Sequence, residues 1–356
     1  MTSTRKVWLI RAGRHGEDEE LALANQRVII GWQQLDDSGD LRTVQDVANA
    51  IRSKDTSGNE HRIANFARQF WAFIHLAQVN DIVVLPLKTR PGQVALGTID
   101  GPYEYVDIGG QKRHSRRVKW VRPDVPRSTF GQDLLYSFGA FMTVCRIQRH
   151  QAEERVAAVL AGKPDPGFKE GKTTPGVPKG PVEDEGGEAA SIDLEQAAQD
   201  DVVAFVRQTF PGHELARLVG TILAAEGYYT LVSPPGPDGG ADILAGRGPF
   251  GLDSPTLCVQ VKATEAPADV KILRELIGTM NTFKADQGLL VCWGGFTQPL
   301  KNEARQQTFK VRLWDQSDIV SAIYRAYEKL DSEIQAELPL KRVWMLVREQ
   351  TEEAPD

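Results

Sequence analysis

The chain has 356 residues, of which 41% are hydrophobic and 25% are charged, and its formal net charge at pH 7 is −6. This length is sufficient for two domains with buried cores, and the composition is that of a globular protein rather than a disordered or fibrous one. The acidic balance excludes binding to nucleic acid through overall positive charge, so any such binding requires a local basic patch.

The three cysteines indicate a reducing compartment. Cys145, Cys258 and Cys292 lie far apart in the sequence and lack the spacing of metal ligands. This pattern argues against a zinc site and against a disulfide framework. The first residues lead into only a short apolar stretch, which predicts neither a signal peptide nor a membrane span. We therefore expect a cytoplasmic protein without a membrane partner.

The N-terminal part, residues 1–160, is predicted to form a mostly β, barrel-like domain. Short apolar runs predict strands at residues 7–10, 82–87, 93–99, 103–107 and 116–121. Turn sequences rich in Pro and Gly, such as those at 90–92 and 100–102, separate several of these runs. Apolar residues at three- and four-residue spacing predict helices at 61–78 and 148–160.

Residues 161–191 differ in composition from the rest of the chain. They are rich in Pro, Gly, Lys and Glu and contain almost no large apolar residues. Such a segment buries too little surface to offset its chain entropy, so it predicts a flexible linker that its prolines keep partly extended. The linker separates the first domain from a second domain at 192–356.

The second domain alternates between helical and strand periodicity. Helices are predicted at residues 195–208, 213–225, 270–283, 299–306 and 315–324. Strands are predicted at residues 228–232, 241–245, 257–262, 288–293 and 311–313. This alternation is typical of an α/β fold with a mixed central sheet flanked by helices.

Two of these strands carry polar residues with catalytic potential. The run DGGADI at 238–243 brings Asp242 from a Gly-rich turn onto an apolar strand, and the run VQVK at 259–262 carries Gln260 and Lys262. These last two residues lie two positions apart, so both side chains point to the same face of the strand. A carboxylate and an ammonium on paired strands can hold a divalent metal and a water for phosphodiester hydrolysis. Asp238 is interpreted as a turn residue.

The second domain resembles the Mrr-type restriction endonuclease domain, a branch of the PD-(D/E)XK nuclease superfamily. The resemblance rests on an ordered set of short runs: HEL at 213–215, EGY at 226–228, DGGADI at 238–243, QVK at 260–262, LIG at 276–278, GLLV at 288–291 and FT at 296–297. It implies a restriction-endonuclease-like fold and DNA cleavage with Mg²⁺, for which Mn²⁺ is an alternative metal.

The resemblance also implies roles for four residues. Asp242 ligates the metal, Lys262 positions the attacking water or stabilises phosphate charge, and Gln260 takes a place that is acidic in the wider superfamily. Because an amide oxygen is a poorer ligand than a carboxylate, Glu214 is expected to supply a second carboxylate to the metal. Two alternatives remain: Glu214 complements a helix dipole, and Lys262 is an ordinary lysine at a strand end.

A basic run in the first domain suits contacts with DNA. It spans 113–120 in a chain that is acidic overall, and its candidate phosphate-binding residues are Arg113, His114, Arg116, Arg117 and Lys119. Aromatic candidates for stacking on an extruded base are Trp32, Tyr103, Tyr105 and Trp120. The alternatives are a solvated charged face for the run and a role in the core for the aromatic residues.

The first domain also resembles the PUA/EVE-like superfamily. The runs that carry this resemblance are VWLIRAG at 7–13, IGW at 30–32, NDIVVLP at 80–86, GTI at 97–99 and GPYEY at 101–105. The resemblance implies a β barrel that reads a modified or flipped base.

A base reader joined to a nuclease predicts a modification-dependent (type IV-like) restriction endonuclease. Its expected partner is double-stranded DNA with a modified base such as methylcytosine. Since one active site cuts one strand, double-strand cleavage implies at least a homodimer. Three alternatives remain: a repair or recombination nuclease that recognises DNA structure, a DNA-binding protein with a degenerate nuclease fold, and an RNA-directed protein.

Overall fold

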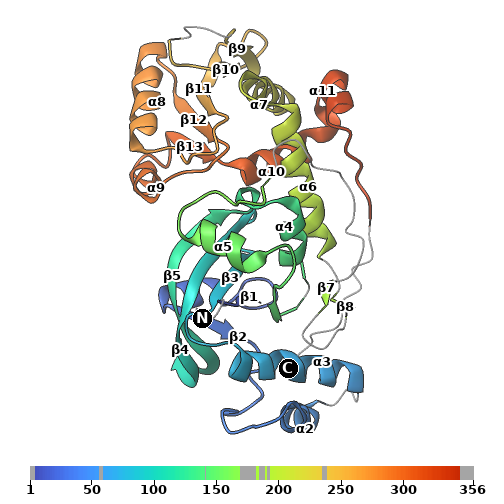
Figure 1. Ribbon diagram of the computed structural model, residues 1–356. Helices are drawn as coiled ribbons and strands as arrows, with labels where there is room; N and C mark the ends of the chain where they lie inside the picture. The colour runs from blue at the N-terminus through green and yellow to red at the C-terminus, as the bar shows by residue number, and fades with distance from the viewer. Residues whose placement is uncertain are drawn as a thin grey trace. The chain divides into compact units, whose positions relative to one another are not determined.

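The computed structural model describes residues 5–55, 59–140, 142–168, 182–183, 189–190, 193–234 and 239–344 (Figure 1). Contacts group the described residues up to Asp200 into one unit and Asp201–Trp344 into another. The division falls inside helix α6 (Leu194–Thr209). The domain and linker boundaries expected from the sequence stay predictions, because most of the expected linker lies outside the described residues.

A six-stranded sheet forms the centre of the first unit, in the order β2-β5-β4-β3-β1-β6. Its strands are β1 (Val7–Ile10), β2 (Arg27–Ile30), β3 (Ile82–Leu87), β4 (Gln93–Ile108), β5 (Gln111–Pro126) and β6 (Val144–Arg146). Strand β1 pairs with β3 in parallel, and the other pairings are antiparallel. A short pair, β7 (Val182–Glu183) with β8 (Ala189–Ala190), is separate from this sheet.

Helices cover both faces of the first sheet. Because side chains alternate along a strand, Val7 and Leu9 pack with α4 (Gln132–Phe138) and α5 (Ala152–Leu160). Trp8 and Ile10 pack on the other face, against a cluster drawn from α2 (Val44–Lys54), α3 (Glu60–Trp71) and the π-helix η1 (Ala72–Leu76). The unit also holds α1 (Glu19–Ala24) and η2 (Arg127–Thr129). The β-rich character that we expected is confirmed, but the described pairings do not close β2 onto β6 as in a full barrel.

A five-stranded mixed sheet forms the centre of the second unit, in the order β13-β12-β11-β10-β9. Its strands are β9 (Tyr229–Val232), β10 (Ile243–Arg247), β11 (Asp253–Lys262), β12 (Gln287–Cys292) and β13 (Val311–Trp314). Strand β10 is antiparallel to β9 and β11, whereas β11, β12 and β13 run parallel to one another. The α/β fold predicted for this part of the chain is confirmed.

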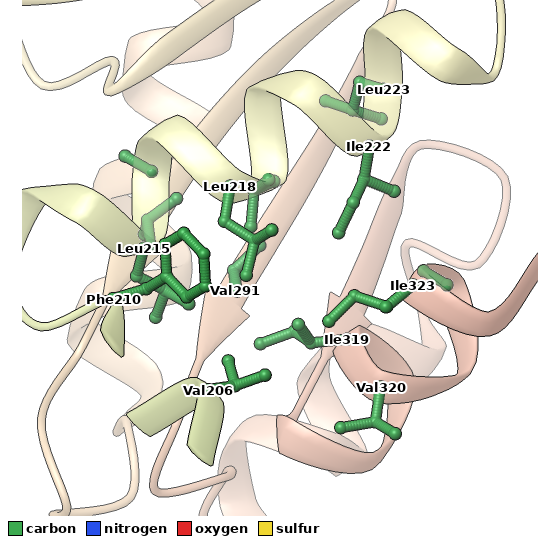
Figure 2. Close-up of a cluster of buried hydrophobic side chains, with 14 of the residues drawn as sticks. Val206, Phe210, Leu215, Leu218, Ile222, Leu223, Val291, Ile319, Val320 and Ile323 are labelled. Atoms are coloured by element: carbon green, nitrogen blue, oxygen red, sulfur yellow. The ribbon is translucent and has the colours of Figure 1, made fainter. Parts of the chain in front are cut away.

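Two helical layers enclose this second sheet. The C-terminal part of α6, α7 (His213–Ala225) and α10 (Gln316–Ala326) pack on one face around Phe210, Leu218 and Ile319 (Figure 2). On the other face, α8 (Val270–Phe283) and α9 (Gln298–Arg305) pack over Cys258 and Leu290. The unit ends with η3 (Tyr327–Lys329) and α11 (Ser332–Glu337). Among the described helices, none is long and apolar enough to cross a membrane.

Candidate functional site

Asp242 lies directly before β10, where its carboxylate reaches the neighbouring strand. Its backbone N–H donates to the carbonyl of Val259 at 3.0 Å, and its Oδ2 accepts the backbone N–H of Val261 at 2.7 Å. The side chain thus takes the place of a backbone acceptor at the end of the β10–β11 ladder. This hydrogen bond holds the carboxylate beside the peptide that joins Gln260 to Val261.

Cys258, Gln260 and Lys262 share one face of β11, because side chains alternate along a strand. Burial raises the pKa of the Cys258 thiol to about 11, and the negative charge of Asp242 adds to the rise. Ile243 pairs with Val259, and both pack in the core on the α7 side, so strand alternation places Asp242 on the same face as Gln260. The structure brings together three of the predicted catalytic residues: Asp242, Gln260 and Lys262.

Gln260 is suited to contact a cation. Its side chain is buried, and its Oε1 has no hydrogen-bond partner among the described residues. A buried acceptor without a partner is unfavourable by about 1–3 kcal/mol. An amide oxygen beside the Asp242 carboxylate is an oxygen donor set of the kind that Mg²⁺ accepts, with waters completing its coordination. The residues present therefore fit the metal that the sequence implies. Over the described ranges, no three His, Cys, Asp or Glu side chains cluster as a metal site.

Glu214 forms an ion pair within α7. Its Oε2 accepts a hydrogen bond from Nε of Arg217 at 2.6 Å, one turn along α7. Arg217 also pairs with Glu337 of α11. Helix α7 packs on the face of the sheet opposite to that of Cys258 and Gln260. The role of Glu214 as a second metal ligand stays a prediction, and these contacts give it a structural role as well.

His213 was part of the motif in the sequence but had no role assigned to it. Its Nε2 lies 2.7 Å from the carbonyl oxygen of Ser233, just after β9. Ser233 donates its backbone N–H to the carbonyl of Asp242 at 2.9 Å and its hydroxyl to that of Ala241 at 2.7 Å. His213 thus ties the start of α7 to the residue that borders Asp242. The two residues are 20 positions apart in the sequence, so a local sequence pattern does not predict this contact.

Asp238, interpreted as a turn residue, lies outside the described residues.

Two residues of the basic run are buried instead of exposed. Arg116 is 3% exposed, and its guanidinium donates to the carbonyl oxygens of Phe73, Ile74 and Gly101. Burial lowers its pKa to about 10. His114 is fully buried. Neither side chain can reach a phosphate from these positions, so we remove both from the predicted phosphate contacts. Strand alternation explains the correction, because both residues point into the core.

The other basic residues of this run differ in how accessible they are. Arg117 and Lys119 are exposed, and Arg117 lies 3.5 Å from Glu104. Arg113 is largely covered and donates to Asp18 at 2.7 Å. Arg117 and Lys119 therefore remain as candidates for phosphate contacts. Arg113 could bind a phosphate only if its ion pair with Asp18 opened.

Aromatic side chains gather around His114. The rings of Tyr103 and Tyr105 stack on its imidazole, with centroids 6.0 and 4.8 Å away, and Phe70 meets it edge-on at 4.8 Å. Trp32 in turn meets Phe70 edge-on at 5.4 Å. The structure thus brings three predicted base-contacting residues, Trp32, Tyr103 and Tyr105, into one half-buried group. Phe66 and Phe70, four residues apart on α3, belong to it and were not predicted.

Hydrogen bonds fix the imidazole of His114 at the centre of this group. Its Nε2 lies 3.1 Å from the carbonyl of Leu35 and 3.2 Å from that of Trp32. Since carbonyls only accept, Nε2 carries the proton and Nδ1 can accept from the Tyr103 hydroxyl at 2.8 Å. Burial lowers the pKa of His114 and raises that of Tyr103 to about 12, so both are neutral at pH 7.

Trp32 adopts a left-handed backbone conformation, with φ of 62°. For a bulky residue this region is unfavourable by about 1–3 kcal/mol, and such strain clusters at functional sites. Trp120, the fourth aromatic candidate, is half-buried and donates its Nε1–H to the carbonyl of Ala22 at 3.4 Å. Trp120 therefore contacts α1, and it also packs against the core cluster on which Trp32 and Tyr103 pack.

Comparison with known proteins gives a family for part of the chain. Residues 207–323 match the Mrr catalytic family, described as a restriction endonuclease. Residues 8–134 match a domain of unknown function. The resemblance of the first domain to PUA/EVE-like readers is therefore not confirmed. No curated protein matches the chain.

The solved structures that are similar to this chain include three of low identity. The DNA modification-dependent restriction endonuclease AspBHI is 15% identical over 80% of this chain and 75% of its own, with a TM-score of 0.32. The MspJI restriction endonuclease, in complex with a 27-mer oligonucleotide, is 14% identical over 93% of this chain and 79% of its own, with a TM-score of 0.31. AF1548, a protein of unknown function, is 16% identical over 38% of this chain and 79% of its own, with a TM-score of 0.26. These TM-scores are low, so we base the function on the chain itself.

Proposed function

We propose, from the premise that residues 207–323 form an Mrr-type restriction endonuclease domain, that this chain is a Mg²⁺-dependent endonuclease that cuts double-stranded DNA carrying modified bases. The observation that carries this proposal is the shared face of Asp242, Gln260 and Lys262, on which a buried amide oxygen lies beside a carboxylate. We further propose a cytoplasmic location, where such DNA is encountered.

The residues of the nuclease site divide the chemistry between them. The Asp242 carboxylate and the Gln260 amide oxygen would hold the metal, which supplies Lewis-acid stabilisation of charge on the scissile phosphate. Lys262 is partly exposed at the end of β11, so its ammonium can hydrogen-bond an attacking water or a phosphate oxygen. The hydrogen bond from Val261 fixes the Asp242 carboxylate before substrate arrives.

The first unit supplies the reading function in this proposal. Trp32, Tyr103 and Tyr105 offer aromatic faces in a half-buried group, and a base extruded from a duplex binds by stacking on such faces. Arg117 and Lys119 lie on β5, the strand that also carries His114, and would hold the flanking phosphates. The strained Trp32 supports a functional rather than a purely structural group.

Substitution of the two charged residues, Asp242 and Lys262, tests the nuclease site. Asp242→Ala and Lys262→Ala should each lower cleavage of methylcytosine-containing plasmid by about 100-fold or more, while binding of the same DNA is kept. Lys271→Ala, an exposed lysine on α8, is the matched control and should cut as the parent does. Undiminished cutting by the Asp242→Ala protein would contradict the mechanism.

A degenerate nuclease fold that only binds DNA is the second candidate, and the neutral Gln260 favours it. That candidate predicts that the parent binds modified DNA without cutting it in Mg²⁺ or Mn²⁺. A single digestion series with both metals separates the two functions.

A further inference from the structure

Four large apolar side chains are exposed together on the second unit. They are Tyr229 and Leu231 on β9 and Phe250 and Leu252 in the turn between β10 and β11, with exposures of 58%, 61%, 79% and 82%. The two parts adjoin, because a Cβ placed on Gly251 would lie 2.8 Å from the Tyr229 ring. We call these four residues the β9 surface.

Strand alternation explains why β9 presents this surface. Val232 faces α7, where it lies against Gly220. Leu231 points to the opposite face and pairs with Leu244, which packs against the α8 cluster that contains Cys258. Strand β9 is the last strand in the order of the described sheet. An edge strand with exposed apolar residues is a surface that proteins normally cover.

We propose that a second copy of this chain covers the β9 surface, in a two-fold symmetric dimer of nuclease units. This inference rests on the proposed function, in which one site cuts one strand and two copies are needed to cut both. In a two-fold interface the same patch meets itself, and an apolar patch is complementary to itself without any matching of charges.

The size of the surface agrees with a dimer. An aromatic side chain buries about 150–250 Å² when it is covered, so four large side chains that are more than half exposed offer on the order of 500 Å² per copy. Two copies would bury roughly 1,000 Å², which is the lower bound for a specific protein interface. The exposed Asp253 and Ser254, which follow Leu252, would add to this area.

DNA is a poorer occupant than a second copy. Binding to the phosphate backbone depends on cations, and none of the four residues carries a charge. Arg247, at the end of β10, directs its guanidinium elsewhere: it donates to the carbonyl of Glu226 at 2.9 Å and lies 3.9 Å from the centre of the Tyr228 ring.

The test uses the full chain with the double substitution Leu231→Glu and Phe250→Glu. The matched control is Phe309→Glu, because Phe309 is 91% exposed just before β13, at the other edge of the sheet. Mass is measured by sedimentation equilibrium, free and with methylcytosine-containing DNA in Ca²⁺. The dimer dissociation constant of the double variant should rise roughly 100-fold or more, with the control unchanged. In Mg²⁺, the parent should linearise supercoiled plasmid, whereas the variant should only nick it.

The outcomes separate this inference from the proposed function. A parent that is monomeric in both states, or a double variant that dimerises as the parent does, overturns the inference. A variant that stays dimeric but no longer cuts assigns the surface to DNA and also overturns it. A parent that dimerises through this surface but never cuts supports the inference and refutes the proposed function.

A second variant covers a failure of the double variant to fold. The three natural cysteines are buried, so Leu231→Cys provides an accessible thiol. A short bismaleimide should cross-link Leu231→Cys into dimers and leave Phe309→Cys monomeric. Equal cross-linking of the two variants contradicts the inference.

Discussion

In the proposed function, Asp242 and Gln260 together set what the nuclease site can bind. The backbone of Val261 holds the carboxylate, and the amide oxygen of Gln260 is buried without a partner among the described residues. One negative charge and one neutral oxygen form a weak ligand set, so we expect metal affinity to be limited by the amide.

Gln260→Glu should therefore strengthen metal binding. The second carboxylate should lower the Mg²⁺ concentration that gives half-maximal cleavage by about tenfold, whereas Gln260→Met should raise it. Without metal, two adjacent carboxylates in a buried site should lower the melting temperature, and Mg²⁺ should restore it. Thermal unfolding with and without Mg²⁺ gives a readout that does not depend on activity. An unchanged response to Mg²⁺ in both variants would remove Gln260 from the site.

Arg116 and Lys119 should behave in opposite ways, although they lie three residues apart. Arg116→Ala leaves the carbonyls of Phe73, Ile74 and Gly101 without their donor, so it should lower the free energy of unfolding by about 3 kcal/mol or more. Lys119→Ala should change stability by less than about 0.5 kcal/mol but weaken DNA binding and its salt dependence. Denaturant unfolding and binding at several salt concentrations check both. A stable Arg116→Ala protein with impaired DNA binding would return Arg116 to the contact surface.

The sequence indicates residue types better than it indicates their surroundings. Gln260 and Lys262 could be assigned to one face because their spacing matches the strand period. Arg116 could not be separated from Arg117, because a basic run looks the same whether or not alternate members point inward. Only the fold shows that η1 places the carbonyls of Phe73 and Ile74 around Arg116.

Helix α7 and strand β9 are joined at the point where the site begins. His213 lies within hydrogen-bond distance of the Ser233 carbonyl, and Ser233 donates its backbone N–H to the carbonyl of Asp242 and its hydroxyl to that of Ala241. We therefore propose that His213 positions Asp242 rather than touching substrate.

Loss of this contact should reduce turnover more than affinity. His213→Ala should lower kcat by about tenfold with little change in KM, because Asp242 is less well held while the DNA surface is intact. His213→Asn keeps a donor near the Ser233 carbonyl and should recover part of the loss. Steady-state kinetics of both variants, with melting temperatures as a folding control, check this expectation. A rise in KM alone would place His213 in substrate binding instead.

A helix with a clear N-terminal capping residue was predicted accurately. Helix α8 spans the residues expected from the sequence because Asp269 caps its first turn by accepting the N–H groups of Lys271 and Ile272. Strand β4 was predicted as two strands, since 100–102 has the composition of a turn. In the fold these residues stay within the strand as an irregularity in its pairing with β5. Cross-strand pairing overrides local turn preference there, and no single-strand pattern contains that information.

The stability of the first unit should decrease at acid pH. Burial by itself would raise the pKa of Asp165, but hydrogen bonds from Arg155 and from the N–H of Gly131 outweigh it and hold the pKa below its ordinary value. A carboxylate with a depressed pKa stabilises the fold fully above its unfolded pKa of about 4, and this contribution is lost as pH falls through the folded value. The melting temperature should therefore drop below about pH 4.

Asp165→Asn provides the check on this expectation. It should be less stable than the parent at pH 7, because the buried Arg155 keeps Asp133 but loses Asp165 as a charged partner. Its melting temperature should also depend less on pH between about 2 and 4. Parallel melting curves of the two proteins would contradict the assignment to Asp165.

The whole chain combines a nuclease unit, identified by family, with a first unit whose activity is proposed from its aromatic and basic residues. The nuclease could be predicted from sequence because its motif residues are few, ordered and chemically constrained. The reader could not be predicted to the same extent, because aromatic residues serve equally as core and as binding surface. The homodimer and the cytoplasmic location stay predictions.

Digestion of matched duplexes decides whether the chain reads modified DNA. Duplexes of one sequence with cytosine, methylcytosine, hydroxymethylcytosine or methyladenine are incubated with the full chain and Mg²⁺, with the Asp242→Ala protein as a blank. We predict cleavage of at least one modified duplex at least about 100-fold faster than that of the unmodified duplex, and no cleavage by the blank. Equal cleavage of all the duplexes would contradict the proposal that the first unit reads a modified base.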